Sequence, residues 1–444
     1  MRNREMRNYL IQLILISQFS FFIFLLPSCE KENYARENEV KLEFSADTVA
    51  FDTLFTTVGS ATRQVRVYNR SGKDVLLSTV SLGKGRASRF RLNVDGDTSM
   101  VARNVEILAG DSIFIFVQVN VKPNDQTSPF IEEDVILFGN GQRLPLTAWG
   151  RNAYYHLPTD TLVFSDGSFM ICDIVDCAEW NLRQHDKPHV IIGTAAVLDG
   201  STLNLTAGDE LYFYNDAMLI FDTNARLTAT GTASQPVLFT SLRHDGWYSF
   251  LPGQWQCILF TGGSHGNTID HAVIENGTGG LRVYPDADLT VSNTVVRNMS
   301  DCGLIGQGGA ITGTNLLVYD CLGALTVIRG GQYSFTGCTF ADYWSYSMRK
   351  QESVVLCNYL QAADGTLQAD ALTAAFTDCI VWGSREEELL MLGVEEYPMN
   401  CTFTHCWLKG TDGAADPQFE DSGKDNYRLQ EGSPAAGIGY QYND

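Results

Sequence analysis

The sequence predicts an all-β protein in which a β-sandwich is followed by a right-handed parallel β-helix. Two observations support this prediction. Short apolar stretches separated by turn signals fill residues 42–150, and a pattern returns every 22 residues between 267 and 342. In both regions apolar positions alternate with little helical spacing, and Val, Ile, Thr and Phe are frequent, which is typical of β-strands.

One position of the 22-residue repeat holds residue types that tolerate a left-handed backbone. It is occupied by His271, Asn293, Asn315 and Gly337, and after longer gaps by Asp378 and His405. The apolar alternation shifts phase by one across this position, so it must be a bend between two strands that face one core. A third apolar stretch completes each period, as at 279–284. Three short strands in 22 residues describe one coil of a parallel β-helix.

Residues 1–28 have the features of an export signal. Arg2, Arg4 and Arg7 precede an apolar run from 9 to 26, and the sequence LPSC follows. This end resembles the bacterial lipobox, which implies that Cys29 becomes the acylated first residue of the mature protein. The alternative is a single membrane-spanning anchor, for which the apolar run is marginal.

Residues 29–41 are charged and lack an apolar period, so we expect a flexible tether. The sequence CEKE resembles a signal for display on the outer surface of Gram-negative bacteria. We therefore expect a lipid-anchored protein of the outer membrane that faces the cell exterior, with the periplasmic face as the alternative. The net charge of −21 argues against nucleic acid as a partner.

Residues 42–150 form a self-contained segment of short predicted strands. The stretches FDTLFTTVGSATRQVRVYNRSG, LAGDSIFIFVQVNVKP and LPLTAWG resemble the ASH-type immunoglobulin-like domains, which implies a stalk or adaptor role. Residues 151–202 then join the two folds. Cys172 and Cys177 in this joining region form either a local disulfide or two buried thiols.

From 203 to about 415 we expect the β-helix. The stretches LNLTAGDELYF and GTASQPVLFTS resemble the entry coils of right-handed parallel β-helix proteins, and with the repeat they place the region in the pectate-lyase-like superfamily. Residues 416–444 resemble the closing segment of bacterial β-helix proteins. We expect them to cap the last coil, because an uncovered coil would expose unpaired strand edges.

The cysteines of the repeat are expected in the core. Cys338, Cys379 and Cys406 each follow the bend position, where the phase of the strands points inward. Small buried apolar side chains are the better interpretation. A zinc site would need a C-x-x-C pair or His at ligand spacing. The nearby candidate is CTFTHC at 401–406, but two of its members already serve the core and the bend, so no metal site is predicted.

No catalytic residue can be assigned from the sequence. The superfamily includes polysaccharide lyases and pectin hydrolases, and the hydrolases carry paired Asp-Asp and Gly-His-Gly motifs that do not occur here. Asp286 and Asp288 would be the residues for Ca²⁺ near Arg297, although solvated turn carboxylates are the commoner case. We expect no cofactor.

Two files of polar side chains should follow the outside of the coils. Glu275, Arg297 and Tyr319 occupy one outward position, one in each coil, and are expected to form a surface ladder. The next position along the chain holds Asn276, Asn298, Asp320 and Asp342. Such a column either coordinates ions or, more commonly, satisfies backbone groups of turns.

Aromatic insertions are the best candidates for ligand contacts. Tyr343, Trp344 and Tyr346 interrupt the period, and flat rings pack well on the apolar faces of sugars. Trp247 and Trp255 form a second candidate group. The alternative is that these rings only pack the inserted loops against the coils.

These features together predict a cell-surface lipoprotein that binds a glycan or a neighbouring surface protein without catalysis. The alternative is a polysaccharide lyase or hydrolase that acts on acidic glycans, with Ca²⁺ in the case of a lyase.

Overall fold

The computed structural model of the chain describes residues 34–124, 129–163, 167–183, 185–198, 200–243, 246–362, 364–411 and 414–442. The predicted export signal and Cys29 lie outside these residues. No helix in the described ranges is long and apolar enough to cross a membrane. The chain divides into two compact units, one mainly before residue 150 and one from Gly150 onward.

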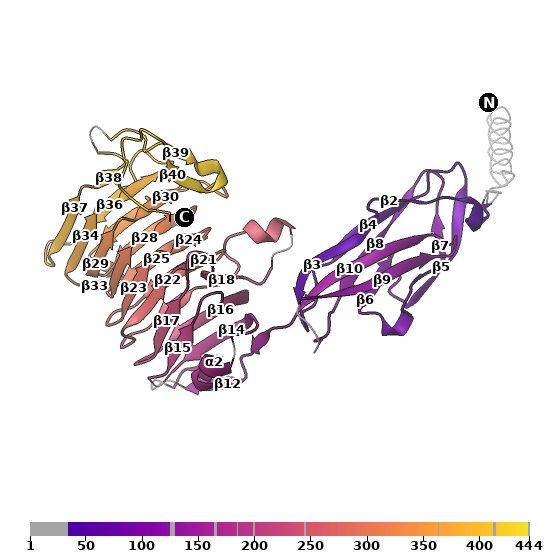
Figure 1. The fold of residues 1–444 in the computed structure, drawn as a ribbon, viewed down its shortest axis with the longest axis horizontal. Coiled ribbons are helices and arrows are strands. Elements are labelled where there is room, and N and C mark those ends of the chain that lie inside the picture. Colours follow the sequence, from indigo (N-terminus) through magenta and orange to yellow (C-terminus); the bar gives the residue numbers. More distant parts are fainter. Residues whose placement is uncertain are drawn as a thin grey trace, which may run out of the picture. The chain divides into compact units, whose positions relative to one another are not determined.

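The first unit is a β-sandwich, as predicted (Figure 1). One sheet has the order β1-β5-β9-β10-β3 with β7 paired to β5, and the other has the order β2-β4-β8-β6. In β8, Ile113, Ile115 and Val117 are buried while the residues between them are more exposed, as expected for a strand with one face on a core. The elements are β1 (Tyr34–Ala35), η1 (Glu37–Glu39), β2 (Glu43–Phe44), β3 (Val49–Phe55), β4 (Arg63–Tyr68), β5 (Asp74–Leu82), η2 (Gly85–Ala87), β6 (Phe90–Val94), β7 (Val101–Ile107), β8 (Ser112–Val119), β9 (Phe130–Phe138) and β10 (Arg143–Arg151).

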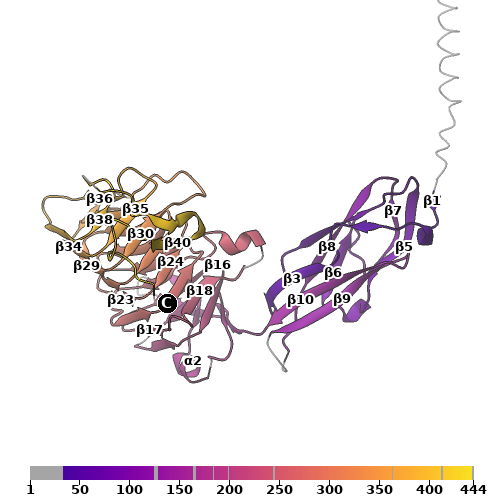
Figure 2. The ribbon, with the colours of Figure 1, turned by 45° about the horizontal axis from the view of Figure 1, so that its top comes forward.

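The second unit is a parallel β-helix whose strands stack coil on coil (Figures 1 and 2). It begins with β11 (Tyr154–His156), β12 (Asp160–Val163), β13 (Phe169–Ile174), α2 (Cys177–Arg183) and β14 (His189–Val197). Because β14 already pairs in parallel with β16 (Glu210–Phe221), the stacked coils start before the expected residue 203. The reason is that β14 has strand composition but lies outside the 22-residue repeat.

Three columns of strands run along the β-helix. The first is β15 (Thr202–Leu205), β17 (Arg226–Thr230), β20 (Asn267–Asp270), β23 (Asp288–Ser292), β26 (Ala310–Thr314), β29 (Gly331–Thr336), β34 (Leu372–Thr377) and β37 (Met399–Thr404). The second is β18 (Val237–Ser241), β21 (Ala272–Glu275), β24 (Val295–Arg297), β27 (Leu317–Tyr319), β30 (Thr339–Asp342), β35 (Ile380–Gly383) and β38 (Trp407–Leu408). The third is β19 (Ile258–Phe260), β22 (Gly279–Val283), β25 (Cys302–Gln307), β28 (Gly323–Ile328), β31 (Val354–Cys357) and β36 (Leu389–Leu392).

The remaining elements lie outside these columns. They are η3 (Gly246–Phe250), the hairpin of β32 (Tyr359–Gln361) and β33 (Leu367–Ala369), and the C-terminal β39 (Phe419–Asp421), η4 (Ser422–Lys424) and β40 (Asn426–Leu429).

The bend column of the sequence is confirmed. The backbone is left-handed at His271 (φ 51°), Asn293 (48°), Asn315 (52°), Gly337 (62°), Asp378 (53°) and His405 (53°). The bends also bond to the neighbouring coil: Asn315 Nδ2 donates to Asn293 Oδ1 at 2.9 Å, and Asn293 Nδ2 donates to Oδ1 of Asp270, the residue before the bend at His271, at 2.9 Å. The 22-residue spacing therefore reflects strands in register, as in the pairing of Ile269 with Val291.

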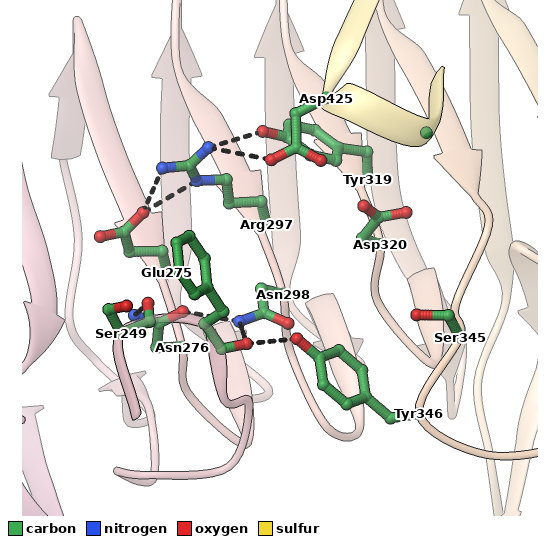
Figure 3. A pocket seen from close by; sticks show the side chains of 12 residues that line it. Ser249, Glu275, Asn276, Arg297, Asn298, Tyr319, Asp320, Ser345, Tyr346 and Asp425 are labelled. Atoms are coloured by element: carbon green, nitrogen blue, oxygen red, sulfur yellow. Dashed lines mark hydrogen bonds and ion pairs between the residues drawn. The ribbon is translucent and has the colours of Figure 1, made fainter. Parts of the chain in front are cut away.

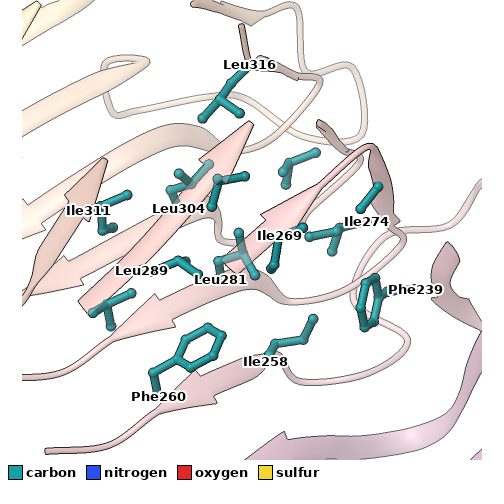
Figure 4. Packing of buried hydrophobic residues seen from close by; sticks show 14 of the residues in the cluster. Phe239, Ile258, Phe260, Ile269, Ile274, Leu281, Leu289, Leu304, Ile311 and Leu316 are labelled. Carbon is teal, nitrogen blue, oxygen red and sulfur yellow. The ribbon is translucent and has the colours of Figure 1, made fainter. Parts of the chain in front are cut away.

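Apolar side chains fill the inside of the coils (Figure 4). Equivalent rings stack between coils, as in Phe335 on Phe376 at 5.2 Å between centroids and Phe376 on Phe403 at 5.0 Å. Cys338 and Cys379 are fully buried in this core, whereas Cys406 in the last coil is only half-buried.

The ten cysteines in the described part of the chain are free thiols. Cys172 and Cys177 are both buried, and burial raises the pKa of the Cys177 thiol to about 11. Of the two alternatives that the sequence left open, the structure has the buried thiols.

The C-terminal segment does not lie where the sequence suggested. Phe419 and Tyr427 pack on the side of the coils, in a cluster with Leu317 and Trp382. The segment then runs back toward earlier coils, where the Gln441 N–H donates to Asn315 Oδ1 at 2.7 Å. We call residues 416–442 the lateral clasp, because they hold the side of the β-helix and not its end.

Candidate functional site

On the second column of strands, the side chains that point out of the coils form a chain of polar and charged contacts (Figure 3). Glu275, Arg297 and Tyr319 lie in register on β21, β24 and β27. Arg297 Nη2 lies 2.7 Å from Glu275 Oε2, and Arg297 Nη1 donates to the Tyr319 hydroxyl at 2.8 Å. The predicted ladder is confirmed, and it fixes the guanidinium on the face of the coils.

The neighbouring polar column forms a second set of bends. The backbone is left-handed at Asn276, Asn298 and Asp320. Asn276 Nδ2 donates to the Ser249 carbonyl at 3.1 Å, and Asn298 Nδ2 donates to the Phe250 carbonyl at 2.7 Å. These amides satisfy backbone groups, as the sequence favoured, and they hold the end of η3 beside the ladder.

The lateral clasp brings a third acidic group to this face. Asp425 Oδ2 lies 3.5 Å from Arg297 Nη1. The Tyr427 hydroxyl donates to Asp320 Oδ1 at 3.2 Å, and Asp320 and Asp425 line the same pocket. Burial, followed by the charge of Asp425, raises the pKa of Asp320 to about 6. The site therefore holds one readily protonated carboxyl beside another carboxyl.

The aromatic insertion closes the opposite side. Ser345 and Tyr346 face the polar columns, and the Tyr346 hydroxyl donates to the Phe250 carbonyl. The insertion is tied down by Arg349, whose guanidinium lies between Asp342 and Glu388 with all three side chains buried. Asp342 thus leaves the surface column that the sequence suggested and becomes a buried anchor.

The coils with the ladder and the polar column, η3, the lateral clasp and the aromatic insertion enclose a pocket of about 430 Å³. This volume is within the range of small-ligand sites. Its lining residues are Ser249, Phe250, Glu275, Asn276, Arg297, Asn298, Tyr319, Asp320, Ser345, Tyr346, Gly423 and Asp425. Three carboxyls and one guanidinium give the lining an acidic balance. Phe250 is 72% exposed and Tyr346 is 44% exposed, so both present ring surface at the rim.

The predicted aromatic residues take different positions. Tyr346 lines the pocket. Trp344 is half-buried beside it, with ring centroids 5.1 Å apart, and Tyr343 packs toward Tyr427 of the clasp. Trp247 is 72% exposed on η3 but does not line the pocket.

Trp255 is not available to a ligand. Its ring is fully buried against Phe213 at 4.2 Å between centroids, and its Nε1 donates to the Glu275 carbonyl at 2.9 Å. The expectation that it belongs to a sugar-binding surface is therefore wrong.

Five lining residues were not identified from the sequence, and Phe250 and Asp425 are the two with ring or charged side chains. Phe250 lies three residues beyond Trp247 in the same aromatic stretch, so the stretch was a usable signal. Asp425 comes from the clasp, and nothing in its local sequence indicates that it meets Arg297.

The described residues contain no group of three or more side chains suited to a metal ion. Asp288, considered above for Ca²⁺, instead accepts a hydrogen bond from His265 Nδ1 at 2.8 Å.

No protein-family model and no curated protein matches the chain. Among solved structures, the ASH/PapD-like domain of human CEP192 is similar at 12% identity and a TM-score of 0.17, covering 29% of this chain and 92% of that one. The catalytic domain of a GH87 α-1,3-glucanase in complex with nigerose is similar at 9% identity and a TM-score of 0.17, covering 78% of this chain and 91% of that one. Neither similarity is strong enough to transfer an activity.

Proposed function

We propose that the chain is a carbohydrate-binding protein whose site is the pocket on the side of the β-helix. The observation that carries this proposal is the combination of exposed rings at the rim, Phe250 and Tyr346, with hydrogen-bonding side chains below them. Ring faces stack on sugar C–H surfaces, while carboxyl, amide and guanidinium groups bind hydroxyls.

The charge of the pocket narrows the ligand class. Three carboxyls face one guanidinium, and Arg297 is already engaged by Glu275 and Asp425. A uronate would bring another negative charge into this acidic site without a free cation to pair with. We therefore propose neutral glycans as ligands, in place of the acidic glycans considered from the sequence.

The test compares glycan binding by the wild type and matched variants. Neutral oligosaccharides selected on a glycan array are titrated calorimetrically into the full chain. Replacing both Phe250 and Tyr346 by Ala should weaken binding by about 2 kcal/mol, since stacked aromatic contacts contribute roughly 0.5–1.5 kcal/mol each. Trp247→Ala is the control, because this ring is equally exposed but outside the pocket. Equal weakening by all variants, or binding of uronate polymers only, would contradict the proposal.

We further propose that the protein is held at the outer membrane by a lipid on Cys29 and faces the cell exterior. The supporting observation is that residues 1–29 contain basic residues, then an apolar run, then the sequence LPSC. Metabolic labelling with a fatty acid should mark the wild type but not Cys29→Ser. External protease should then remove the protein from intact cells, whereas protection from protease would indicate the periplasmic face.

A second candidate function, glycoside hydrolysis, is favoured by one specific observation. Asp320, with its pKa raised to about 6, lies beside Asp425, and glycosidases use a carboxylic acid together with a carboxylate. Hydrolysis should then decline above pH 6 as the Asp320 proton is lost. Reducing ends released from neutral polysaccharides by the wild type, but not by Asp320→Asn, would establish it. Binding without any release would leave carbohydrate binding as the function.

A further inference from the structure

Within the part of the chain that the structure describes, no segment covers the core of the last coil of the β-helix. Inward side chains of β34 in the preceding coil, such as Ala374 and Phe376, are essentially fully buried. Their partners in register on β37, Cys401 and Phe403, are only half-buried. The same change separates β31 from β36, where buried Leu356 is in register with Met391, which is 51% exposed.

The backbone of this coil is also unpaired on one side. The Leu372 N–H donates to the Pro398 carbonyl, and the Asp378 N–H donates to the Thr404 carbonyl. Even-numbered residues of β37 thus bond to β34. Because peptide groups alternate along a parallel strand, those of Cys401 and Phe403 point away from β34. β37 is the terminal strand of its sheet, so within the described residues these groups meet no further strand.

The lateral clasp leaves this end open, since it packs on the side of the coils and reaches back to Asn315. An apolar surface next to an unpaired strand edge is a template for strand addition. The turns around the opening carry Glu386, Glu387, Glu395 and Glu396, which are all exposed and form no ion pair with another described residue. The opening is therefore apolar at its centre and acidic at its rim.

We propose that the last coil docks an extended, cationic segment of a partner protein, which adds to β37 as a further strand. Alternate apolar side chains of that segment cover Met399, Cys401 and Phe403, and its Lys and Arg residues meet the rim glutamates. A second copy of this chain is disfavoured as the occupant, because end-to-end contact would bring two acidic rims together and each chain carries a net charge of −21.

The test uses a fluorescent synthetic peptide of alternating Lys and Val, with binding to the full chain followed by anisotropy at low salt. A peptide with Glu in place of Lys and a peptide N-methylated at alternate positions serve as controls, because they remove the charge and the backbone donors respectively. The Lys-Val peptide should bind, and both control peptides should fail.

The matching protein variant is Glu395→Lys with Glu396→Lys, which leaves the strands untouched and should weaken binding about tenfold. Glu133→Lys with Glu431→Lys changes the net charge equally at positions that are not part of the last coil, and should retain near-wild-type binding. Equal binding of all three peptides, or equal weakening by both variants, would show non-specific attraction and overturn the proposal. A dimer of the wild type seen by light scattering without peptide, and dispersed by excess Lys-Val peptide, would overturn it in favour of a second copy as the occupant.

Discussion

Replacing Arg349 by Met is expected to release the aromatic insertion that forms one wall of the pocket. The guanidinium lies 3.4 Å from Asp342 and also bonds Glu388, and both carboxyls are fully buried. Removing one partner of a buried ion pair costs about 3–5 kcal/mol, because the remaining charge is left without compensation. Here both carboxyls keep other donors, such as the Ser353 hydroxyl to Asp342 at 2.8 Å. We therefore expect the lower end, about 3 kcal/mol.

The loss of stability caused by Arg349→Met should be larger at high pH than at low pH. Burial raises the pKa of Asp342 to about 7 although Arg349 opposes the shift. A carboxyl with a raised folded-state pKa contributes stability that is full below its unfolded pKa and is lost as the pH rises through the folded value. Without Arg349 the pKa of Asp342 rises further, so the variant should lose more stability at pH 8 than at pH 5.

Hydrogen exchange of residues 345–353 measures this effect locally. A loss of about 3 kcal/mol corresponds to exchange faster by about 100-fold. Lys350→Met is the control, because Lys350 is the exposed neighbouring cation. Unchanged protection in the Arg349 variant, or a loss that is the same at pH 5 and pH 8, would refute the reasoning.

Three further predictions concern the coils and the pocket. Asn293→Val should lower the free energy of unfolding, measured by urea titration, by about 1–2 kcal/mol, because a β-branched residue must then adopt φ 48°. Asn293→Gly should lower it much less. Equal losses in the two variants would contradict the bend assignment. Phe376→Ala should lower the free energy of unfolding by about 3–5 kcal/mol in the same assay, since the ring is fully buried between two stacked phenylalanines. A loss below about 1 kcal/mol would indicate a loosely packed core. Because the pKa of Asp320 is raised to about 6, the free energy of unfolding of the wild type should fall as the pH rises from about 4 to about 6. Asp320→Asn should remove this part of the pH dependence. The same pH dependence for both proteins in urea titrations would contradict the assignment.

The architecture was accessible from sequence because it repeats. Bends such as Asn293 and Asn315 recur at 22 residues, and the conformational preference of their side chains is local. The ladder of Glu275 and Arg297 followed from the same spacing, because residues 22 apart lie side by side on strands that pair in register. Trp255 was misplaced because the strand phase could not be read in the irregular loop that precedes β19, so the sequence did not show that its ring faces the core.

The sequence by itself determined the strand periods, the left-handed bends and the outward file of charges, since all three depend on interactions between neighbouring residues or neighbouring coils. Only the tertiary structure decided which distant segments close the pocket. Asp425 meets Arg297 across more than 100 residues because the clasp turns back along the coils, and Tyr346 faces Phe250 because a buried ion pair holds the insertion down. Such contacts depend on the path of the chain after it leaves the repeat, which no local pattern encodes.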